Sequence, residues 1–336
     1  MEKQWRGLPY FTIADHYRNL FGTKVYKIPV TIADTCPNRE GLKGMETCIF
    51  CNEWGSAARS DSHTMELNEQ IEKYKKDISQ KYKAQQFLVY FQAYTNSFLK
   101  IQKLRENFDA ALAHEHVKGF VLGTRPDCLS LALLNLWNEY QEKTFVGIEL
   151  GIQSFFDKDL LFLKRGHTTL DSLRAIERIS RDTKCDLGIH LIFGLPDETD
   201  EQIVKSAEIC NDLPITNIKL HNLHVLKKTG LEQLYQSKAF TPIAREEYTR
   251  RVGIFLAHLS PRFFLHRLAA LAPRWDELIA PAWTADKMGT HQFIVDYLRN
   301  NKIYQSKSFT ASTPELGASQ ERHRIFCEPV EFFSKP

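Results

Sequence analysis

Three cysteines, Cys36, Cys48 and Cys51, stand close together in the segment CPNREGLKGMETCIFC. Eleven residues separate the first two and two residues separate the last pair, so one compact loop can aim three thiolates at a single point. Three thiolates are the ligand set of an iron–sulfur cluster that keeps one iron open. The apolar run at residues 25–32 has the character of a buried strand. We therefore expect the thiols just past the C-terminal end of a strand, where parallel barrels carry their chemistry.

Two other kinds of site fit the same cysteines. His63 follows Cys51 by twelve residues and could complete a zinc site, although structural zinc sites usually show paired CxxC knuckles and only one pair is present. Cys48 and Cys51 could also form a redox CxxC, but that motif normally opens a helix of a thioredoxin-like unit and would leave Cys36 idle. The spacing alone leaves the cluster and zinc both open.

The composition is that of a globular protein with a large core. The chain has 336 residues, 43% of them hydrophobic, enough for one large α/β barrel or two ordinary domains. No run approaches a membrane span, and the N-terminal MEKQWRGLPYF is charged where a secretory signal is apolar. We therefore expect a cytoplasmic protein without a membrane partner. The net charge of +3 is too weak to indicate nucleic-acid binding by itself.

The remaining cysteines do not indicate a disulfide framework. The chain has seven cysteines, an odd number, and four of them stand singly without paired spacing. Each of these four is expected to be a small buried hydrophobic residue; they are Cys128, Cys185, Cys210 and Cys327.

Apolar runs of strand length alternate with segments of helical spacing over most of the chain. Residues 67–82 repeat apolar side chains at intervals of three and four, which predicts a covering helix, and later strands start roughly thirty to forty residues apart, the length of a βα unit with a parallel crossover. These patterns predict a partial (β/α)6 TIM-type barrel, because nothing after His221 repeats them cleanly. The predicted strands are 25–32, 87–91, 119–123, 146–151, 187–193 and 217–221, and the further helices are 98–112, 129–137, 170–179 and the segment through 203–210.

The two ends of the chain differ from this repeat. Thr12 and Asp15 form a capping pair before a short helix that stops at Gly22, and we expect this helix to close one end of the barrel. From about residue 227, arginines accumulate among aromatic residues, which is typical either of a surface that binds a nucleic-acid backbone and stacks bases or of an amphipathic helix with a solvated face. Neighbouring carboxylates offset much of the positive charge, which favours the amphipathic helix over the nucleic-acid surface. The residues concerned are Arg245, Arg250, Arg251, Arg262, Arg267 and Arg274, with Tyr248, Phe255, Phe263, Phe264 and Trp275.

Polar residues gather where four of the predicted strands end. A buried glutamate or histidine inside an apolar strand is costly without a partner, so Glu149 and His190 are expected to face a polar cavity. Four such ends in matching positions make isolated structural hydrogen bonds a poor explanation. The ends carry Gln92 to Asn96, Thr124 to Asp127, Glu149 with Gln153, and His190 with Gly194.

These motifs together resemble a known family. The cysteine loop, with Phe50 directly before its last cysteine, resembles the radical S-adenosylmethionine (SAM) enzymes, although eleven residues replace the usual three between the first two cysteines. The longer spacing is similar to that of the YhcC/YtqA-like family, which is related to the radical SAM domain of Elp3. Motifs spread over about residues 10–300 share the resemblance: YFQAYTNSF, GTRPDC, ELGIQS, LKRGHT, HLIFGLPDET, IKLHNLHVLK, LAPRW and APAW. This resemblance favours an iron–sulfur cluster over zinc at the three cysteines.

The resemblance implies a set of cofactors and ligands. A [4Fe-4S] cluster would sit on Cys36, Cys48 and Cys51, its fourth iron would bind SAM, and reduction would release a 5′-deoxyadenosyl radical that takes hydrogen from a substrate. The matching positions assign the SAM amino group to Gln92 and Tyr94, the SAM carboxylate to Arg165, and the ribose to Gln153 and His190. They assign adenine to the backbone around Ile192 to Leu195, which includes Gly194. Glu149, Arg125 and Asp127 are left as catalytic candidates that would meet the substrate or the ribose.

The resemblance also implies a function, and more than one substrate class stays open. Its relation to Elp3 implies tRNA as a partner and side-chain modification of the wobble uridine, without acetyl transfer because the chain has no room for an acetyltransferase domain. A flavodoxin- or ferredoxin-type protein would donate electrons. The alternatives are a HemN-like radical SAM enzyme for a small metabolite, which shares GLP and the Gln-Ser pair of GIQS, and a non-catalytic SAM- or haem-binding relative. The predicted organisation is an N-terminal helical segment 1–24, the partial barrel 25–225, a C-terminal helical extension 226–305 and a loosely ordered tail 306–336.

Overall fold

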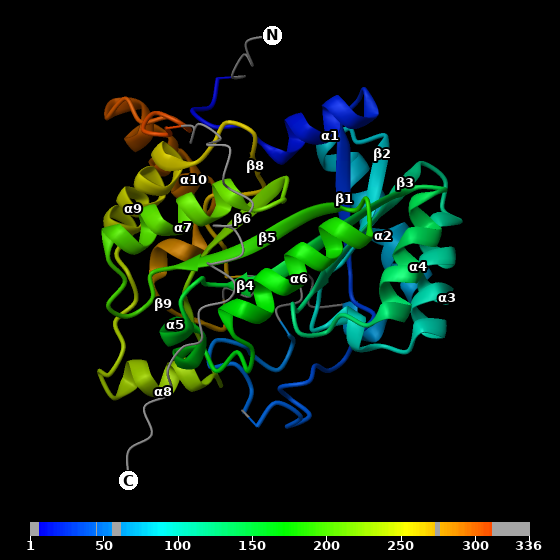
Figure 1. Cartoon of the computed structure of the whole chain (residues 1–336), viewed down its shortest axis with the longest axis horizontal. Helices are drawn as coiled ribbons and strands as arrows, with labels where there is room; N and C mark the ends of the chain where they lie inside the picture. Colours follow the sequence, from blue (N-terminus) through cyan, green and yellow to red (C-terminus); the bar gives the residue numbers. More distant parts are fainter. Residues whose placement is uncertain (1–6, 45, 56–61, 273–275, 311–336) are drawn as a thin grey trace, which may run out of the picture.

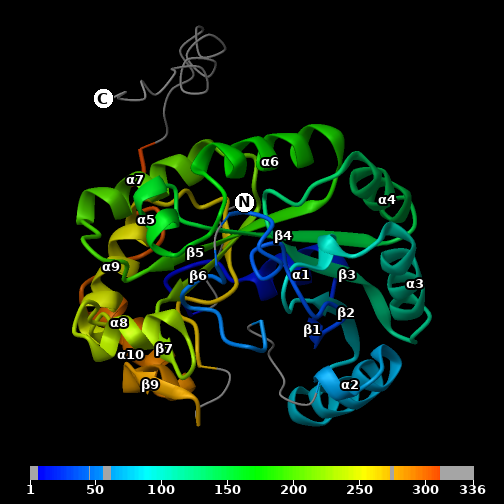
Figure 2. The same cartoon turned by 90° about the horizontal axis from the view of Figure 1, so that it is seen from below.

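A curled sheet of seven parallel strands forms the centre of the molecule. The computed structural model describes residues 7–44, 46–55, 62–272 and 276–310. The sheet has the order β1-β2-β3-β4-β5-β6-β8, and a separate antiparallel pair consists of β7 and β9. Viewed from below, the strands curve around a central space and the helices α2, α3, α4, α6 and α7 follow one another outside them (Figure 2).

The elements follow one another as an alternation of strand and helix (Figure 1). The strands are β1 (Val25–Val30), β2 (Gln86–Phe91), β3 (Val117–Thr124), β4 (Phe145–Gln153), β5 (Asp186–Phe193), β6 (Asn217–Asn222), β7 (Val225–Leu226), β8 (Phe264–Leu265) and β9 (Leu278–Ala280). The α-helices are α1 (Ile13–Phe21), α2 (Leu67–Tyr82), α3 (Ile101–Leu112), α4 (Leu131–Gln141), α5 (Asp157–Phe162), α6 (Thr169–Asp182), α7 (Asp200–Asp212), α8 (Gly230–Gln236), α9 (Arg245–His258) and α10 (Lys287–Asn300).

The continuous apolar runs become strands that are buried on both faces, as parallel sheets require. In β2, Phe87 and Val89 belong to the main core beneath the outer helices, whereas Leu88 and Tyr90 belong to a smaller core inside the curl. Capping boxes at the N-termini of α6 and α7, with Thr168 as one of the capping residues, satisfy backbone N–H groups that would otherwise have no partner. These caps fix where the two helices begin. Because the strands of the main sheet are parallel, their carboxyl ends meet at one edge.

The helix α1 lies against the opposite, amino-terminal end of the sheet. Its cap is the one predicted, since the Thr12 side chain accepts from the backbone N–H of Asp15, and Gly22 ends the helix in the left-handed conformation. Tyr17 is buried in the small inner core, where its ring meets Phe145 edge to face at 5.9 Å. The N-terminal helix therefore covers the bottom of the curl, as expected.

The main sheet has one strand more than predicted, and the pair of β7 and β9 was not predicted. The sequence predicted six strands, and the described residues add β8, a strand of two residues that pairs in parallel with β6. Because β8 lies in the predicted C-terminal extension, the sheet is not confined to residues 25–225. The predicted domain boundaries stay predictions.

The C-terminal helices pack against the barrel. Val252 and Leu256 of α9 are fully buried in the main core with Ile294 of α10. After α10, the backbone N–H groups of Ser306 and Ser308 donate to carbonyls of α9. The predicted loose tail lies outside the described residues from 311 onward. Across the described segments, no helix combines the length and apolarity that a membrane crossing would need.

Candidate functional site

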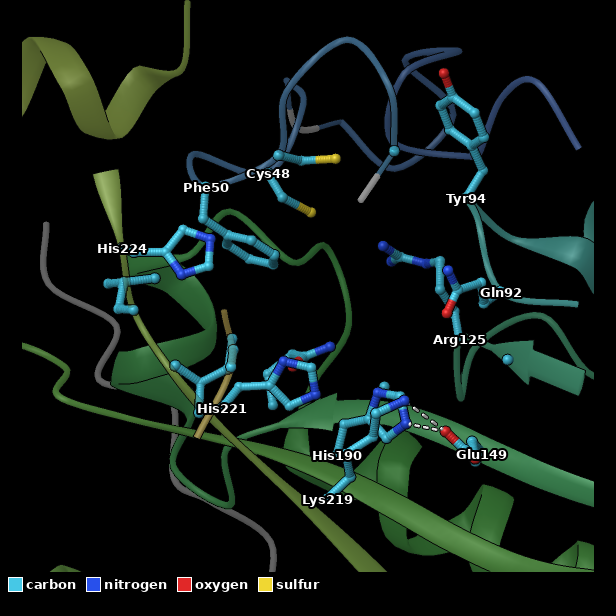
Figure 3. A pocket seen from close by; sticks show the side chains of 18 of the residues that line it. Cys48, Phe50, Gln92, Tyr94, Arg125, Glu149, His190, Lys219, His221 and His224 are labelled. Carbon is cyan, nitrogen blue, oxygen red and sulfur yellow. Dashed lines mark hydrogen bonds and ion pairs between the residues drawn. The ribbon is translucent and has the colours of Figure 1, made fainter. Parts of the chain in front are cut away.

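A cavity of about 460 Å³ lies at the carboxyl edge of the strands, with the cysteine loop on one side and a group of polar strand residues on the other (Figure 3). It brings together ten of the twelve predicted site residues. These ten are Cys36, Cys48, Cys51, Gln92, Tyr94, Arg125, Glu149, Gln153, Arg165 and His190. The other two, Asp127 and Gly194, do not line it.

The cysteine loop is held in place from two distant parts of the chain. The backbone N–H of Ile49 donates to the carbonyl of Leu163 (3.2 Å), and its carbonyl accepts from the N–H of Leu231 (2.8 Å) at the start of α8. The side-chain amide of Asn52 donates to Glu277 (2.9 Å). The loop is thus fixed between the end of α5 and the C-terminal segment, although it has no regular secondary structure of its own.

Hydrogen-bond donors point at the sulfur atoms. Cys48 Sγ accepts from Asn38 Nδ2 (3.3 Å) and from Arg165 Nη1 (3.5 Å), and Cys51 Sγ accepts from Arg39 Nη2 (3.6 Å). Burial raises the pKa of the Cys51 thiol, and the Arg39 guanidinium opposes that shift. Donors beside sulfur also tune a cluster that thiolates ligate. The donor set therefore fits a cluster held by Cys36, Cys48 and Cys51.

A zinc site fits the same residues less well. Within the described ranges, no group of three His, Cys, Asp or Glu side chains converges on one point, although the cysteine spacing would allow it. A single zinc ion requires that convergence, whereas a cluster takes each thiolate on a different iron. The side chain of His63, the candidate fourth zinc ligand, lies outside the described residues.

Arg165 stands next to the cysteine loop with capacity to bind a ligand. Its Nη2 donates to the carbonyl of Gly151 (2.8 Å), and its buried Nε finds no partner among the described residues. A buried donor without a partner is costly, so this guanidinium is suited to an anionic group that enters the cavity. The prediction that it meets the SAM carboxylate is compatible with this position.

Arg125 has a carboxylate partner of its own. It donates to both oxygens of Asp127 (2.9 and 3.0 Å) and to the carbonyl of Arg165 (2.5 Å). Burial would raise the pKa of the Asp127 carboxyl, but the hydrogen bonds from Arg125 and Lys43 lower it to about 2. Asp127 therefore orients Arg125 from behind, and of the two only Arg125 reaches the cavity.

Two predicted cofactor residues have unusual backbone conformations. Tyr94 and Gln153 both have positive φ angles, 54° and 73°, which non-glycine residues seldom adopt and which cluster at functional sites. Gln153 lies where the pairing of β4 with β5 shifts register after Leu150, and such a bulge redirects a side chain at the end of a strand. Gly55 approaches the Tyr94 ring so closely that a Cβ would stand 2.4 Å from it, so a larger residue there would displace Tyr94.

Glu149 is the centre of a buried charge cluster beneath the cavity. This carboxylate, whose side chain is 2% exposed, pairs with Lys27 and with Lys219 Nζ (3.0 Å). It also accepts from Tyr90 Oη (2.7 Å) and contacts His190 Nε2 (2.6 Å), and Figure 3 shows the last contact together with that of Lys219. Both oxygens of the carboxylate are thus engaged, Oε1 by Lys27 and Oε2 by Tyr90, His190 and Lys219.

The charges in this cluster stabilise one another unequally. Burial would raise the pKa of the Glu149 carboxyl, but Lys219 and Lys27 hold it well below its usual range. Burial lowers the pKa of Lys219 to about 8, although Glu149 opposes that shift. Burial, with Lys219 nearby, also lowers the pKa of His190 to about 4. At neutral pH the cluster therefore contains one carboxylate, two ammonium groups and a neutral imidazole.

Sequence analysis did not single out several polar residues that line the cavity. Lys219 and His221 alternate along β6, and this period of two in NIKLHN is a signal that both side chains face the same side of a strand. His224 and Lys287 gave no comparable signal. Arg267 was grouped with the arginines of a nucleic-acid surface, but it lies in the cavity, where its Nη2 contacts His221 (2.8 Å).

Three other arginines and four aromatics of that group have structural roles. Arg250 donates to both oxygens of Asp200 (2.6 and 2.7 Å), Arg251 pairs with Glu198 (2.6 Å), and Arg262 donates to four backbone carbonyls. Tyr248, Phe255 and Phe263 are fully buried and Phe264 is half-buried. This arrangement is that of an amphipathic helix and its supports, and the buried aromatics cannot stack on bases. Arg274 and Trp275 lie outside the described residues.

Gly194 serves a turn outside the cavity. Its φ is +87°, and a Cβ would stand 2.6 Å from the side chain of Ile243, so the position requires glycine. Its backbone N–H donates to Glu198 (2.8 Å). The neighbouring Ile192 does line the cavity.

The fold and the thiol-lined cavity agree with a family match over most of the chain. Residues 30–210 match the model of the Radical SAM superfamily, and residues 215–300 match that of the Radical_SAM C-terminal domain. The chain therefore belongs to the radical SAM superfamily, whose members are enzymes that use a [4Fe-4S] cluster and SAM.

Its relatives confirm the predicted YhcC/YtqA-like family. The chain is 31% identical to YtqA of Bacillus subtilis over 89% of its own length and 92% of the relative, and 32% identical to YhcC of Escherichia coli over 80% and 85%. The structure of an N-terminally truncated Elp3 from Methanocaldococcus infernus superimposes with a TM-score of 0.62 at 16% identity, covering 84% of this chain and 64% of that one. That last likeness shows a shared fold.

Proposed function

We propose that this chain applies the radical chemistry of its superfamily to a substituent of the wobble uridine of tRNA. The proposal is supported by a local similarity of 26% identity over 156 residues to the tRNA uridine(34) acetyltransferase of Methanocaldococcus infernus, which covers 46% of this chain and 28% of that protein. The fold that the chain shares with Elp3 agrees with it.

One observation carries the assignment of the chemistry to this cavity: three thiols and three arginines line the same space. Cys36, Cys48 and Cys51 would hold the cluster. Arg165 would bind the SAM carboxylate through the planar fork that suits such groups. When bound and reduced, the cluster and SAM supply a carbon radical that removes a hydrogen atom from the substrate.

The residues of the chain would position the reactants and exclude water. Asn38 and Arg39 would donate hydrogen bonds to the sulfur atoms of Cys48 and Cys51. Gln92 and Tyr94, on the opposite side of the cavity from the cysteine loop's Phe50 (Figure 3), would fix the SAM amino group. Glu149, neutralised by its lysines, would hold His190 toward the ligand through their hydrogen bond. A flavodoxin- or ferredoxin-type protein would deliver the electron.

A small anionic metabolite is the second candidate substrate. It is favoured by the arginines of α9 and the segment after it, because Arg250, Arg251 and Arg262 are committed to contacts within the protein and are not free to neutralise an RNA backbone. Under this alternative the substrate would be confined to the cavity. No RNA-binding surface would then be needed.

Two measurements test the proposal in order. Protein reconstituted anaerobically and reduced should hold about four irons per chain and convert SAM to 5′-deoxyadenosine; failure of both would refute SAM cleavage at this cavity. Nucleosides from the tRNA of a deletion strain and its parent should then differ, by mass spectrometry, in a modified uridine. An unchanged nucleoside profile with intact SAM cleavage would refute tRNA as the substrate and leave the small metabolite.

A further inference from the structure

Arg267 is a cation deep in the cavity whose partners are not carboxylates. Its Nη2 contacts the two ring nitrogens of His221 (2.8 and 3.1 Å), and its buried Nε has no partner among the described residues. Within those residues no carboxylate lies at ion-pairing distance from it, in contrast to Arg125, Arg250 and Arg251. A guanidinium that is buried without a counter-ion is costly, and an anion bound in the cavity would offset that cost.

The groups around Arg267 do not supply the missing negative charge. Glu149 is the carboxylate of the cavity floor, and it already pairs with Lys27 and Lys219. The described floor therefore has three cationic side chains for one carboxylate. The excess positive charge faces the cavity, which Arg267 and Lys219 both line.

Neutral hydrogen-bond donors line the cavity together with Arg267 and Lys219, and these side chains form one wall of it. His224 Nδ1 and Asn222 Nδ2 are buried without partners among the described residues, and both side chains line the cavity. Burial, with Arg267 nearby, lowers the pKa of His224 to about 4 and that of His221 well below its usual range, so both imidazoles are neutral at pH 7 and each has one N–H to donate. Figure 3 shows His221 and His224 on one side of the cavity, opposite Gln92 and Arg125.

Such a wall matches the chemistry of an oxyanion. A planar guanidinium binds a carboxylate or a phosphate through two parallel hydrogen bonds, and unpartnered N–H groups around it would satisfy the remaining oxygen lone pairs. SAM has a carboxylate of its own, but that group has a separate candidate in Arg165 beside the cysteine loop. Because Arg125 is already paired with Asp127, Arg165 and Arg267 remain for two anionic groups.

We propose that Arg267, with His221, Asn222 and His224, forms a subsite for a carboxylate or phosphate of the substrate. The identity of the occupant as the substrate rests on the proposed function, but the subsite itself does not. Lys219 adds positive charge from below, where Glu149 holds it. The subsite would fix the substrate's anion at the wall and leave the rest of the substrate to extend toward the cysteine loop.

Isothermal titration of anions into the cluster-loaded, SAM-saturated protein tests the subsite without any turnover. The probes are inorganic phosphate and succinate. We expect wild type to bind at least one of them at millimolar concentrations or below, and Arg267→Gln to bind it about tenfold or more weakly, as the loss of a charge-assisted hydrogen bond implies. Arg181→Gln is the matched control, because Arg181 is an exposed arginine that pairs only with Asp182, and it should bind as wild type does. Binding of phosphate alone would identify a phosphate-bearing substrate, and binding of succinate alone a carboxylate-bearing one.

The stability of the variants separates a binding role from a structural one. If Arg267 is an unpaired cation that awaits an anion, Arg267→Met should unfold in urea at the same or a higher concentration than wild type when no anion is present. Arg267→Lys keeps the charge and should retain weaker anion binding, which guards against a Gln variant that does not fold. Binding of neither probe to wild type, or equal affinities in wild type and Arg267→Gln, would overturn the proposal, as would loss of stability in Arg267→Met with unchanged anion binding. Because no electron donor is present, these outcomes do not depend on whether SAM is cleaved.

Discussion

Replacing Glu149 by glutamine removes the one negative charge that two buried lysines share. The side chain of Glu149 is 2% exposed, and those of Lys27 and Lys219 are 17% and 12% exposed, so water cannot replace the lost interaction. Breaking a buried ion pair by removing one partner costs about 3–5 kcal/mol. We therefore expect Glu149→Gln to lower the free energy of unfolding by about 3–5 kcal/mol at pH 7.

The size of this loss should depend on pH because Lys219 can release its proton. In wild type the pKa of Lys219 is lowered to about 8, and without the carboxylate it falls further. Between the two values the wild-type folded state binds a proton that the variant does not bind, so the difference in stability shrinks as the pH rises through 8. From pH 7 to pH 9 it should shrink by at most about 1.4 kcal/mol, the free energy of the one pH unit between 7 and the wild-type pKa of about 8.

Urea unfolding of wild type and variant at pH 7 and pH 9 measures both effects. The control is Glu139→Gln, since Glu139 is 40% exposed and pairs with Arg105 at the surface, where an ion pair contributes less than about 1 kcal/mol. Iron binding should be kept in both variants, because neither residue contacts the cysteine loop. An unchanged urea midpoint in Glu149→Gln would show that the negative charge of Glu149 does not stabilise the lysines around it. A larger loss of unfolding free energy at pH 9 than at pH 7 would show the same.

Three further results are expected. Cys36→Ala should lose the iron and the production of 5′-deoxyadenosine, whereas Cys128→Ala should keep nearly normal iron by colorimetric assay; SAM cleavage by Cys36→Ala would contradict the ligand assignment. Arg165→Lys should bind SAM about tenfold or more weakly in equilibrium dialysis, because the ammonium lacks the planar fork, and unchanged affinity would argue against its role. Burial lowers the pKa values of His190 and His224 to about 4, whereas an unperturbed histidine has a pKa of about 6.5. The unfolded state therefore takes up their protons first as the pH falls. Each histidine should thereby cost about 2 kcal/mol of stability at pH 5, measured by urea unfolding at pH 7 and 5, and a double His→Gln variant with an equally steep loss would refute this cause.

The fold could be predicted largely because its strands are long apolar runs and its helices repeat apolar residues at intervals of three and four. Residues 67–82 form the helix α2 with the predicted bounds, and the end of each predicted strand lies within three residues of the end observed. The strand β8 was missed because two residues, Phe264 and Leu265, are too few to show any period. It exists because it pairs with β6, which is a contact that local sequence does not reveal.

The site could be predicted where one segment contains the whole signal, and not where partners lie far apart. The three cysteines stand in one short segment, so their spacing already predicted that they would lie in one place, and all three line the cavity. Arg250 and Arg267 look alike in the sequence, but Arg250 meets Asp200 and Arg267 meets His221, and only the folded chain decides which arginine is paired on the surface and which enters the cavity. The cluster around Glu149 likewise joins five elements, so its sequence signal was limited to a single acidic residue in an apolar strand.

The attachment of the cysteine loop sets an order on the maturation of this protein. Ile49 is fastened to Leu231, and Asn52 to Glu277, so the loop reaches its final shape only after the chain has been made well beyond the strands of the barrel. Domains generally fold from the N-terminus as they leave the ribosome. Here the cysteine loop is made early, but it would take its final conformation only after the segments that contain Leu231 and Glu277 have been made. Delivery of iron and sulfide to the loop would accordingly follow translation, and truncations that remove α8 or Glu277 should yield chains that the cluster-assembly machinery fails to load.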